Sequence, residues 1–286
     1  MYDVRLVTTA PLPADDPDTP RLASALRAAG VEVDLADWHD ATVDWSTARV
    51  TVLRSPWDYV DRLDEFLQWA THVATVSALW NPIALVRWNT HKSYLLDLMT
   101  RGAPVVPTVV LTRGGAAALD GIADAQGWNT VVVKPAVGVG ARGAGRFAIG
   151  DEAGQRHLDE LLAVGDVLVQ PYAASVESVG ELSIVLAEGR VTHGVRKRPA
   201  AGEYRIHEEY GGRLEACALT PGLIELAERV CSVLPAPALY ARVDLLELSG
   251  GWHVLEVEVT EPRLFLELGP ADATEQLVKA VMARLT

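Results

Sequence analysis

Three carboxylates near the end of the chain have the spacing of a metal site. Asp244 lies in one apolar segment, and Glu256 and Glu258 lie in the next. Successive side chains of a strand point to opposite faces, so Glu256 and Glu258 share a face. A turn at residues 249–251 folds Asp244 back to within about one residue of Glu256, and directly opposed residues have Cβ atoms about 5 Å apart. The spacing therefore predicts three acids in one small patch.

Such a patch requires a cation, because like charges at this distance repel each other. Carboxylate oxygens suit Mg²⁺ or Mn²⁺, and Mg²⁺ commonly takes one or two protein carboxylates together with substrate phosphates. Arg242 lies two residues before Asp244 and faces the same side, where it can meet phosphate oxygens. The alternative is a solvated face of an edge hairpin. The neighbours of these acids are Val, Leu and Trp rather than Lys and Ser, which favours a metal site formed by Asp244, Glu256 and Glu258.

A lysine followed by a glycine-rich loop has the composition of a phosphate site. Lys134 ends the apolar run 130–134. The loop after it contains four glycines, Gly138, Gly140, Gly143 and Gly145. A loop with so few side chains lets backbone N–H groups approach phosphate oxygens, and the lysine adds charge. We expect a hairpin flap with a glycine tip that closes over a nucleotide, and a plain surface loop is the alternative.

Two other nucleotide signatures do not fit this loop. Residues 138–143 spell G-x-G-x-x-G, but a dinucleotide-binding fingerprint opens a helix, and residues 145–149 have the pattern of a strand. A Walker sequence, G-x-x-x-x-G-K-[ST], is absent from the chain. The loop therefore argues against a Rossmann dehydrogenase.

The first third of the chain predicts a parallel sheet. Apolar runs of strand length alternate there with segments of helical periodicity. We expect strands at 4–9, 31–35 and 49–54 and helices at 21–29 and 61–76. This βαβαβ order implies a parallel sheet covered by helices. A break at Asn81-Pro82 precedes one long helix over 83–99.

The rest of the chain carries antiparallel patterns. We expect strands at 108–111, 130–134, 145–149 and 167–170 and helices at 116–126 and 152–164. Two hairpins follow, 182–186 with 190–196 around residues 188–189, and 239–248 with 252–259 around residues 250–251. The fold class is therefore α/β, with an N-terminal parallel βαβ domain, a flap-like central subdomain and a C-terminal antiparallel sheet with helices.

Composition narrows the class of partner. The 286 residues include 38 acidic and 25 basic side chains, a formal net charge of −13, which argues against nucleic acid or an anionic membrane as the main partner. Cys217 and Cys231 have no metal-ligand spacing and are expected to be buried or incidental thiols. The first residues lack a basic segment followed by an apolar core, and no apolar run reaches the roughly 18 residues that span a bilayer. We expect a cytoplasmic protein.

In order and spacing these motifs resemble the ATP-grasp superfamily, especially the branch with glutathione synthetase and the amino-acid ligases. The resemblance runs over roughly residues 85–262 and implies Mg²⁺-ATP as the cofactor. It implies nucleotide contacts for Lys92, Lys134, Gly138, Gly140, Gly143, Gln170, Pro171, Tyr172 and Glu177. It implies catalytic roles for Lys134, Arg205 and Arg242, and metal ligation by Asp244, Glu256 and Glu258. The family usually has asparagine where this chain has Glu258, which leaves open how Glu256 and Glu258 divide their roles.

The same resemblance divides the chain into a substrate-side domain at 1–88, a central domain with a lid at 89–171 and a catalytic domain at 172–286. Residues 54–59 end the third strand at the carboxyl edge of the sheet, where α/β sheets place ligands. Arg54 suits a carboxylate and Asp58 an ammonium group, with Trp57 between them, which together describe an amino acid. The alternative is a helix-capping turn with a buried tryptophan. Further substrate contacts are expected from His207 and from Arg196 in the basic cluster 196–198.

The resemblance implies an ADP-forming ligase that joins carbon to nitrogen through an acyl phosphate. Segments 54–59, 80–82 and 87–89 are similar to a subgroup whose reaction closes O-ureido-D-serine into an isoxazolidinone ring. An intermolecular amino acid or dipeptide ligase, an ATP-grasp kinase and an ATP-binding sensor without ligase activity stay open as alternatives. Dimers are common among such proteins, so a homodimer is expected by association.

Overall fold

The N-terminal part of the chain forms a parallel sheet. The computed structural model describes residues 1–200, 203, 206 and 210–285. The first sheet has the strand order β2-β1-β3-β4, all parallel. Its strands are β1 (Tyr2–Thr8), β2 (Val33–Asp37), β3 (Ala48–Ser55) and β4 (Ala78–Trp80). The predicted parallel sheet is confirmed, and β4 escaped prediction because three residues are too few to show a pattern.

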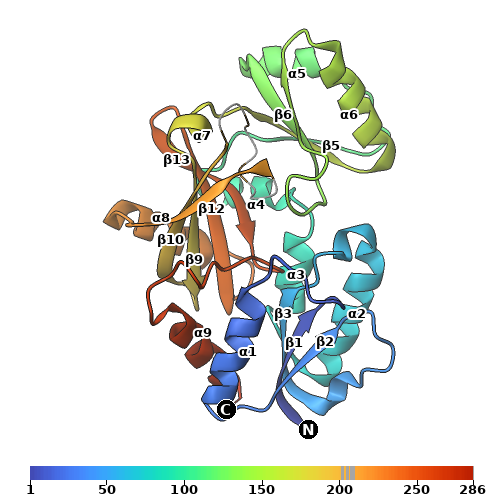
Figure 1. The fold of residues 1–286 in the computed structure, drawn as a ribbon. Helices are drawn as coiled ribbons and strands as arrows, with labels where there is room; N and C mark the ends of the chain where they lie inside the picture. The colour runs from blue at the N-terminus through green and yellow to red at the C-terminus, as the bar shows by residue number, and fades with distance from the viewer. Residues whose placement is uncertain (201–202, 204–205, 207–209, 286) are drawn as a thin grey trace.

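Helices cover both faces of this sheet (Figure 1). On one face lie α1 (Asp18–Ala28) and, from the far end of the chain, α9 (Ala273–Met282), and on the other lies α2 (Leu63–Val76). Leu6 packs with α1 and α9, whereas its neighbour Val7 packs with α2, as strand alternation requires. Two 3₁₀ turns, η1 (Trp45–Thr47) and η2 (Tyr59–Asp61), connect these elements. The predicted domain boundaries stay a prediction.

The long helix expected over 83–99 is wrong. The structure has two helices there, α3 (Ile83–Asn89) and α4 (Tyr94–Thr100). Between them the backbone N–H of Lys92 donates to the carbonyl of Ala136 at 2.7 Å. The Lys92 N–H therefore makes no hydrogen bond within a helix. Lys92 lies in the loop between α3 and α4 and not on the helix that was expected.

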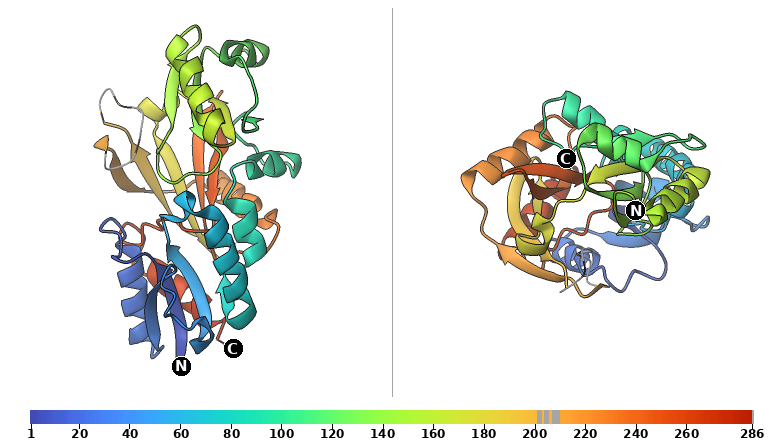
Figure 2. Two further views of the ribbon diagram at one scale, coloured as in Figure 1. Left: turned by 90° about the vertical axis from the view of Figure 1, so that its right-hand side faces the viewer. Right: turned by 90° about the horizontal axis from the view of Figure 1, so that it is seen from above.

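The central part is a four-stranded antiparallel sheet in the order β5-β8-β6-β7. Its strands are β5 (Val109–Leu111), β6 (Thr130–Pro135), β7 (Gly145–Ala148) and β8 (Val167–Pro171). Helices α5 (Leu119–Gln126) and α6 (Glu152–Val164) bury their apolar sides against it. These predicted elements are confirmed. Figure 2 shows this part at the opposite end of the molecule from both termini.

The C-terminal part is a five-stranded antiparallel sheet in the order β11-β10-β9-β12-β13. Its strands are β9 (Glu181–Ala187), β10 (Arg190–Arg198), β11 (Arg213–Cys217), β12 (Tyr240–Leu248) and β13 (Gly251–Glu258). Helix α7 (Ser175–Ser178) precedes the sheet, and α8 (Pro221–Ser232) packs on its apolar face with Ile184 and Val243. Both predicted hairpins are confirmed, and the second turns at Ser249 and Gly250, which have positive φ. No helix in the described part of the chain is long and apolar enough to cross a membrane.

Candidate active site

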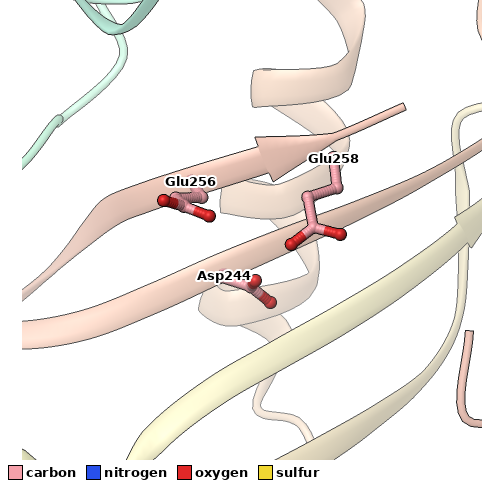
Figure 3. Close-up of side chains that lie close together, drawn as sticks. All are labelled: Asp244, Glu256 and Glu258. Atoms are coloured by element: carbon pink, nitrogen blue, oxygen red, sulfur yellow. The ribbon is translucent and has the colours of Figure 1, made fainter. Parts of the chain in front are cut away.

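The three predicted metal carboxylates meet on the polar face of the C-terminal sheet (Figure 3). Asp244 of β12 pairs directly with Glu256 of β13, and Arg242 pairs with Glu258. One carboxylate oxygen of each acid lies within 4.8 Å of the others. The prediction of Asp244 opposite Glu256 is therefore confirmed, and three hard oxygen donors at this separation fit Mg²⁺ or Mn²⁺.

Side chains of residues 81–94, the segment that contains α3 and the start of α4, hold β13 at the edge of the sheet. The amide side chain of Asn89 donates to the Val257 carbonyl at 2.6 Å and accepts from the Val259 N–H at 3.0 Å. The Tyr94 hydroxyl accepts from the Val257 N–H, and Asn81 donates to the Val259 carbonyl. An edge strand would otherwise present these groups unpaired. The contacts fix the strand that carries Glu256 and Glu258.

Two lysines from different parts of the chain converge on Glu256. Lys134, at the end of β6, donates to its Oε1 at 2.9 Å, and the Nζ of Lys92 lies 3.7 Å from the same oxygen. Lys92 also donates to the carbonyl of Gly138 in the glycine loop at 2.7 Å. Burial opposes ionisation, but the two lysines outweigh it and lower the pKa of Glu256 to about 2. Glu256 is therefore a carboxylate at neutral pH.

Arg242 joins the other two carboxylates. Its Nε and Nη2 donate to the two oxygens of Asp244 at 3.0 and 2.8 Å, and Nη2 also donates to Glu258. Burial raises the pKa of Asp244, but Arg242 and Lys197 outweigh it and hold that pKa well below its usual range. Burial raises the pKa of Glu258, and Arg242 offsets only part of the rise. Glu258 is the more readily protonated of the two.

The sequence interpretation included Lys197 only within the basic cluster 196–198, and it missed Glu181. Both are buried, and the Nζ of Lys197 lies 2.9 Å from Glu181 and 3.6 Å from Asp244. Burial raises the pKa of Glu181 to about 7, although Lys197 opposes the rise. Arg196, the predicted substrate contact, instead donates to the Val179 carbonyl at 2.7 Å. Side-chain alternation along β10 could have distinguished the two basic residues. Lys197 lies on the same face as buried Val195, whereas Arg196 lies on the other face.

The predicted nucleotide residues around the end of β8 lie close together. Gln170 is buried and donates to Thr108, and Pro171 ends the strand. The hydroxyl of Tyr172 donates to Glu177 at 2.6 Å. Arg146 donates to the same oxygen of Glu177 at 3.0 Å and stacks on the Tyr172 ring at 3.7 Å. Arg146 was not predicted as part of this group. The nucleotide roles of Gln170, Pro171, Tyr172 and Glu177 stay predictions.

The glycine loop connects β6 to β7 as the predicted flap. Gly140 and Gly143 have φ values of 61° and 74°, which favour glycine, and a Cβ on Gly143 would lie 2.9 Å from Pro135. Two residues of the loop contact the N-terminal part. Val139 packs against the apolar cluster between the first sheet and α2, and Arg142 pairs with Asp61 at 3.0 Å. The loop of Gly138, Gly140 and Gly143 thus extends from Lys92 and Lys134 to the N-terminal part.

The predicted substrate segment meets the chain that follows β13. Arg54 is 1% exposed and donates to the Pro262 carbonyl at 3.1 Å, and Trp57 donates to the Glu261 carbonyl at 2.9 Å. Asp58 accepts from Trp38 at 2.9 Å and lies 3.3 Å from His39. Arg205 and His207 lie outside the described residues. Their predicted roles, and those of Arg54, Trp57 and Asp58, stay predictions.

The described charges of the site balance. Four cations, Lys92, Lys134, Lys197 and Arg242, contact four carboxylates, Glu181, Asp244, Glu256 and Glu258. A dication matches the carboxylates, and a polyphosphate matches the cations. The arrangement therefore suits a metal–polyphosphate complex.

Two family models match the chain. Residues 4–81 match the D-cycloserine synthetase DcsG N-terminal domain, and residues 100–272 match the ATP-grasp domain of prokaryotic glutathione synthetase. The chain is 34% identical over 299 aligned residues to the cycloserine biosynthesis protein DcsG of Streptomyces lavendulae, with 98% of each protein covered. These matches confirm the resemblance predicted from the sequence.

Solved structures extend the comparison. The crystal structure of D-cycloserine synthetase DcsG superposes with a TM-score of 0.91 at 32% identity and covers 99% of both chains. The ATP-grasp ligase PsnB, in a complex with Mg and ADP, superposes with a TM-score of 0.70 at 18% identity and 100% coverage of both chains. At that identity PsnB shares the fold alone. The predicted fold class is confirmed.

Proposed function

Because the chain belongs to the ATP-grasp ligase family, we propose that it closes a ring within an amino-acid-like substrate, with O-ureido-D-serine as that substrate. The observation that carries the proposal is the match along the whole chain, N-terminal substrate-side part included, to D-cycloserine synthetase. The glutathione synthetase relatives match a smaller part of the chain. The glutathione synthetase of Prochlorococcus marinus, for example, matches 70% of it at 29% identity. The N-terminal part therefore favours the ring-closing subgroup.

The ATP-grasp family uses Mg²⁺-ATP, and this chain offers Asp244, Glu256 and Glu258 to hold the ion, with Mn²⁺ as the alternative. The ion supplies charge neutralisation for the β- and γ-phosphates. With an ion held by the carboxylates, Lys92 and Lys134, which now contact Glu256, would be available to the phosphates. Arg242 and Lys197, which now contact Asp244, would likewise be available to the transferred phosphoryl group. The exchange keeps the buried charges paired throughout, which avoids the cost of an uncompensated buried charge.

The reaction has two steps. A carboxylate oxygen of the substrate attacks the γ-phosphorus, the bond to the bridging oxygen breaks, and ADP leaves. The ureido nitrogen that is bonded to oxygen then attacks the carbonyl carbon of the acyl phosphate and loses its proton, and phosphate leaves. The ring formed in this step still carries the carbamoyl group on that nitrogen, and its removal needs a separate hydrolysis by water. Arg242, Lys134 and Arg205 are the proposed groups that stabilise the negative charge of both steps. The loop at 136–144 closes over the site and excludes water, which would hydrolyse the acyl phosphate.

An intermolecular amino acid or dipeptide ligase is the second candidate. The match of residues 100–272 to the ATP-grasp domain of prokaryotic glutathione synthetase favours it, because that segment includes the proposed metal residues Asp244, Glu256 and Glu258. An ATP-binding sensor is disfavoured, because binding alone does not need four cations, three of them buried, among the carboxylates. A cytoplasmic location and a homodimer stay predictions. Size-exclusion chromatography with light scattering tests the homodimer.

The test is Mg²⁺-ATP-dependent ADP release against O-ureido-D-serine and a panel of amino acids, with mass detection of products. ADP with a cyclised product supports ring closure. ADP with a condensed product supports the second candidate, and ADP with a phosphorylated product makes the protein a kinase. ATP binding without stimulated ADP release from any substrate argues for the sensor.

A further inference from the structure

Glu261 is a buried carboxylate between the substrate segment and the metal site. It is 8% exposed and follows Glu258, the last of the metal carboxylates, by three residues. The charged groups that act on it most strongly are Glu258, Lys92 and Arg242, all from the site described above. On its other side the hydroxyl of Tyr59 hydrogen-bonds to its carboxylate. Glu261 therefore lies on the N-terminal side of the metal cluster.

Four side chains, from α1, β3, the turn after β3 and β12, fix the backbone of this segment. Trp57 donates to the Glu261 carbonyl and Arg54 to the Pro262 carbonyl, and Arg242 donates to the Arg263 carbonyl at 3.0 Å. Asp18, at the start of α1, accepts from the next three backbone N–H groups, those of residues 264–266, at 2.6–3.1 Å. These hydrogen bonds hold a segment without regular structure in one conformation. Together with the hydrogen bond from Tyr59, they position the Glu261 carboxylate before any ligand binds.

Glu261 lacks the cation that its neighbours have. Asp244, Glu256, Glu258 and Glu181 each have a lysine or arginine nitrogen within 4.0 Å. For Glu261, no such nitrogen lies within 4.0 Å among the residues that the structure describes. Burial and then Glu258 raise its pKa to about 8, with Lys92 opposing. With this pKa the group is mostly protonated at neutral pH, and a positively charged ligand group would stabilise its ionised form.

The position also suits a substrate. In an open parallel sheet, ligands bind at the carboxyl ends of the strands where the strand order reverses. Here that point lies between β1 and β3, whose last residues Thr8 and Ser55 hydrogen-bond through their hydroxyls at 2.8 Å. Residues 57 and 59, which hold Glu261, follow directly after β3. The carboxylate therefore lies beside the expected ligand position of this sheet.

We infer that Glu261 binds the ammonium group of the amino-acid-like substrate, an inference that rests on the proposed function. An ammonium at Glu261 leaves the substrate carboxylate free to approach the cations of the site. Asp58, the ammonium ligand predicted from the sequence, already accepts from Trp38 and lies beside His39. Among the described residues Glu261 has no basic side chain within 4.0 Å, whereas Asp58 has His39 at 3.3 Å.

The experiment compares the wild-type protein with Glu261→Gln, Asp58→Asn and Tyr59→Phe. Glutamine keeps the size of Glu261 and accepts from the Tyr59 hydroxyl, so we expect a native circular dichroism spectrum. KM is measured for O-ureido-D-serine, for its analogue without the amino group, and for ATP. Glu267→Gln is the control, because Glu267 lies on the same segment and pairs with Arg263 at 2.8 Å instead of facing the site.

We expect Glu261→Gln to raise KM for O-ureido-D-serine at least about 30-fold, since it removes the charge that pairs with the ammonium. KM for ATP should stay within about twofold, and the preference over the des-amino analogue should disappear. Tyr59→Phe should raise KM in the same direction by less, and Glu267→Gln should leave it within about threefold.

A fall in kcat at unchanged KM overturns the inference, and so does a larger effect of Asp58→Asn than of Glu261→Gln. A wild-type protein that turns over no member of the panel refutes the proposed function instead. Calorimetric titration with the same amino acids then tests Glu261 separately. Equal affinities of the wild-type protein and Glu261→Gln, or binding to neither, overturn the inference.

Discussion

Replacing Glu256 by glutamine tests the charge balance of the site. The change keeps the size of the side chain but removes the anion that holds Lys134 at 2.9 Å and Lys92 at 3.7 Å. Lys134 is itself buried, so it loses its partner without gaining solvent. We expect a folded but less stable protein.

The magnitude follows from the pKa of Glu256. The pKa falls from the ordinary 4.5 to about 2, and each pKa unit corresponds to about 1.4 kcal/mol, so the upper limit is about 3.5 kcal/mol. Since 19% of the side chain is exposed, solvent screening reduces this to about 2 kcal/mol. A carboxylate with a lowered pKa contributes this stability above pH 4.5. The contribution is lost as the pH falls from about 4.5 towards 2.

Urea unfolding at pH 7, 4 and 3 measures this difference. We expect Glu256→Gln to be about 2 kcal/mol less stable than the wild-type protein at pH 7 and the gap to shrink steadily towards pH 3. Glu228→Gln is the control, since its partner Arg190 is 81% exposed and such a pair contributes under about 1 kcal/mol. Equal stability at pH 7, or a gap that persists unchanged at pH 3, would refute the reasoning.

Three further outcomes are expected. Lys134→Ala and Asp244→Asn should each abolish measurable ADP release while the circular dichroism spectrum stays native, and near-normal turnover in either variant would remove that residue from the site. Arg242→Lys keeps the charge but loses the two-pronged contact with Asp244, so kcat measured by coupled ADP release should fall at least about 100-fold. Arg142→Glu breaks an exposed pair with Asp61, whose side chains are 65% and 62% exposed, and should raise substrate KM by no more than about fivefold, with the charge-swapped double variant restoring it.

Local patterns predicted the parts of the site that lie close together in the chain. Asp244, Glu256 and Glu258 were placed on one face because strand alternation and a tight turn act over a few residues. The loop after Lys134 was predicted as a flap for the same reason, since its two strands pair directly across it. These patterns indicated a divalent metal and a nucleotide, and the resemblance between motifs then implied that they are Mg²⁺ and ATP.

Local pattern could not predict the break at residues 90–93. The apolar periodicity of α3 and α4 is continuous enough to predict one helix, and the break depends on a hydrogen bond from Lys92 to Ala136, 44 residues along the chain. Similarly, α9 packs beside α1 on the first sheet although the whole chain separates them. Neither contact leaves a signal in the residues around it.

The sequence by itself determined the fold class, the hairpin with its three acids and the lysine with its glycine loop, because periodicity and turns depend on neighbouring residues. Only the tertiary structure decided which cation meets which acid. It placed Lys197 beside Asp244, drew Lys92 and Lys134 onto Glu256, and set Glu261 against Tyr59 without a cation within 4.0 Å among the described residues. Electrostatic pairing depends on distance and burial, and both are set by how remote segments pack together.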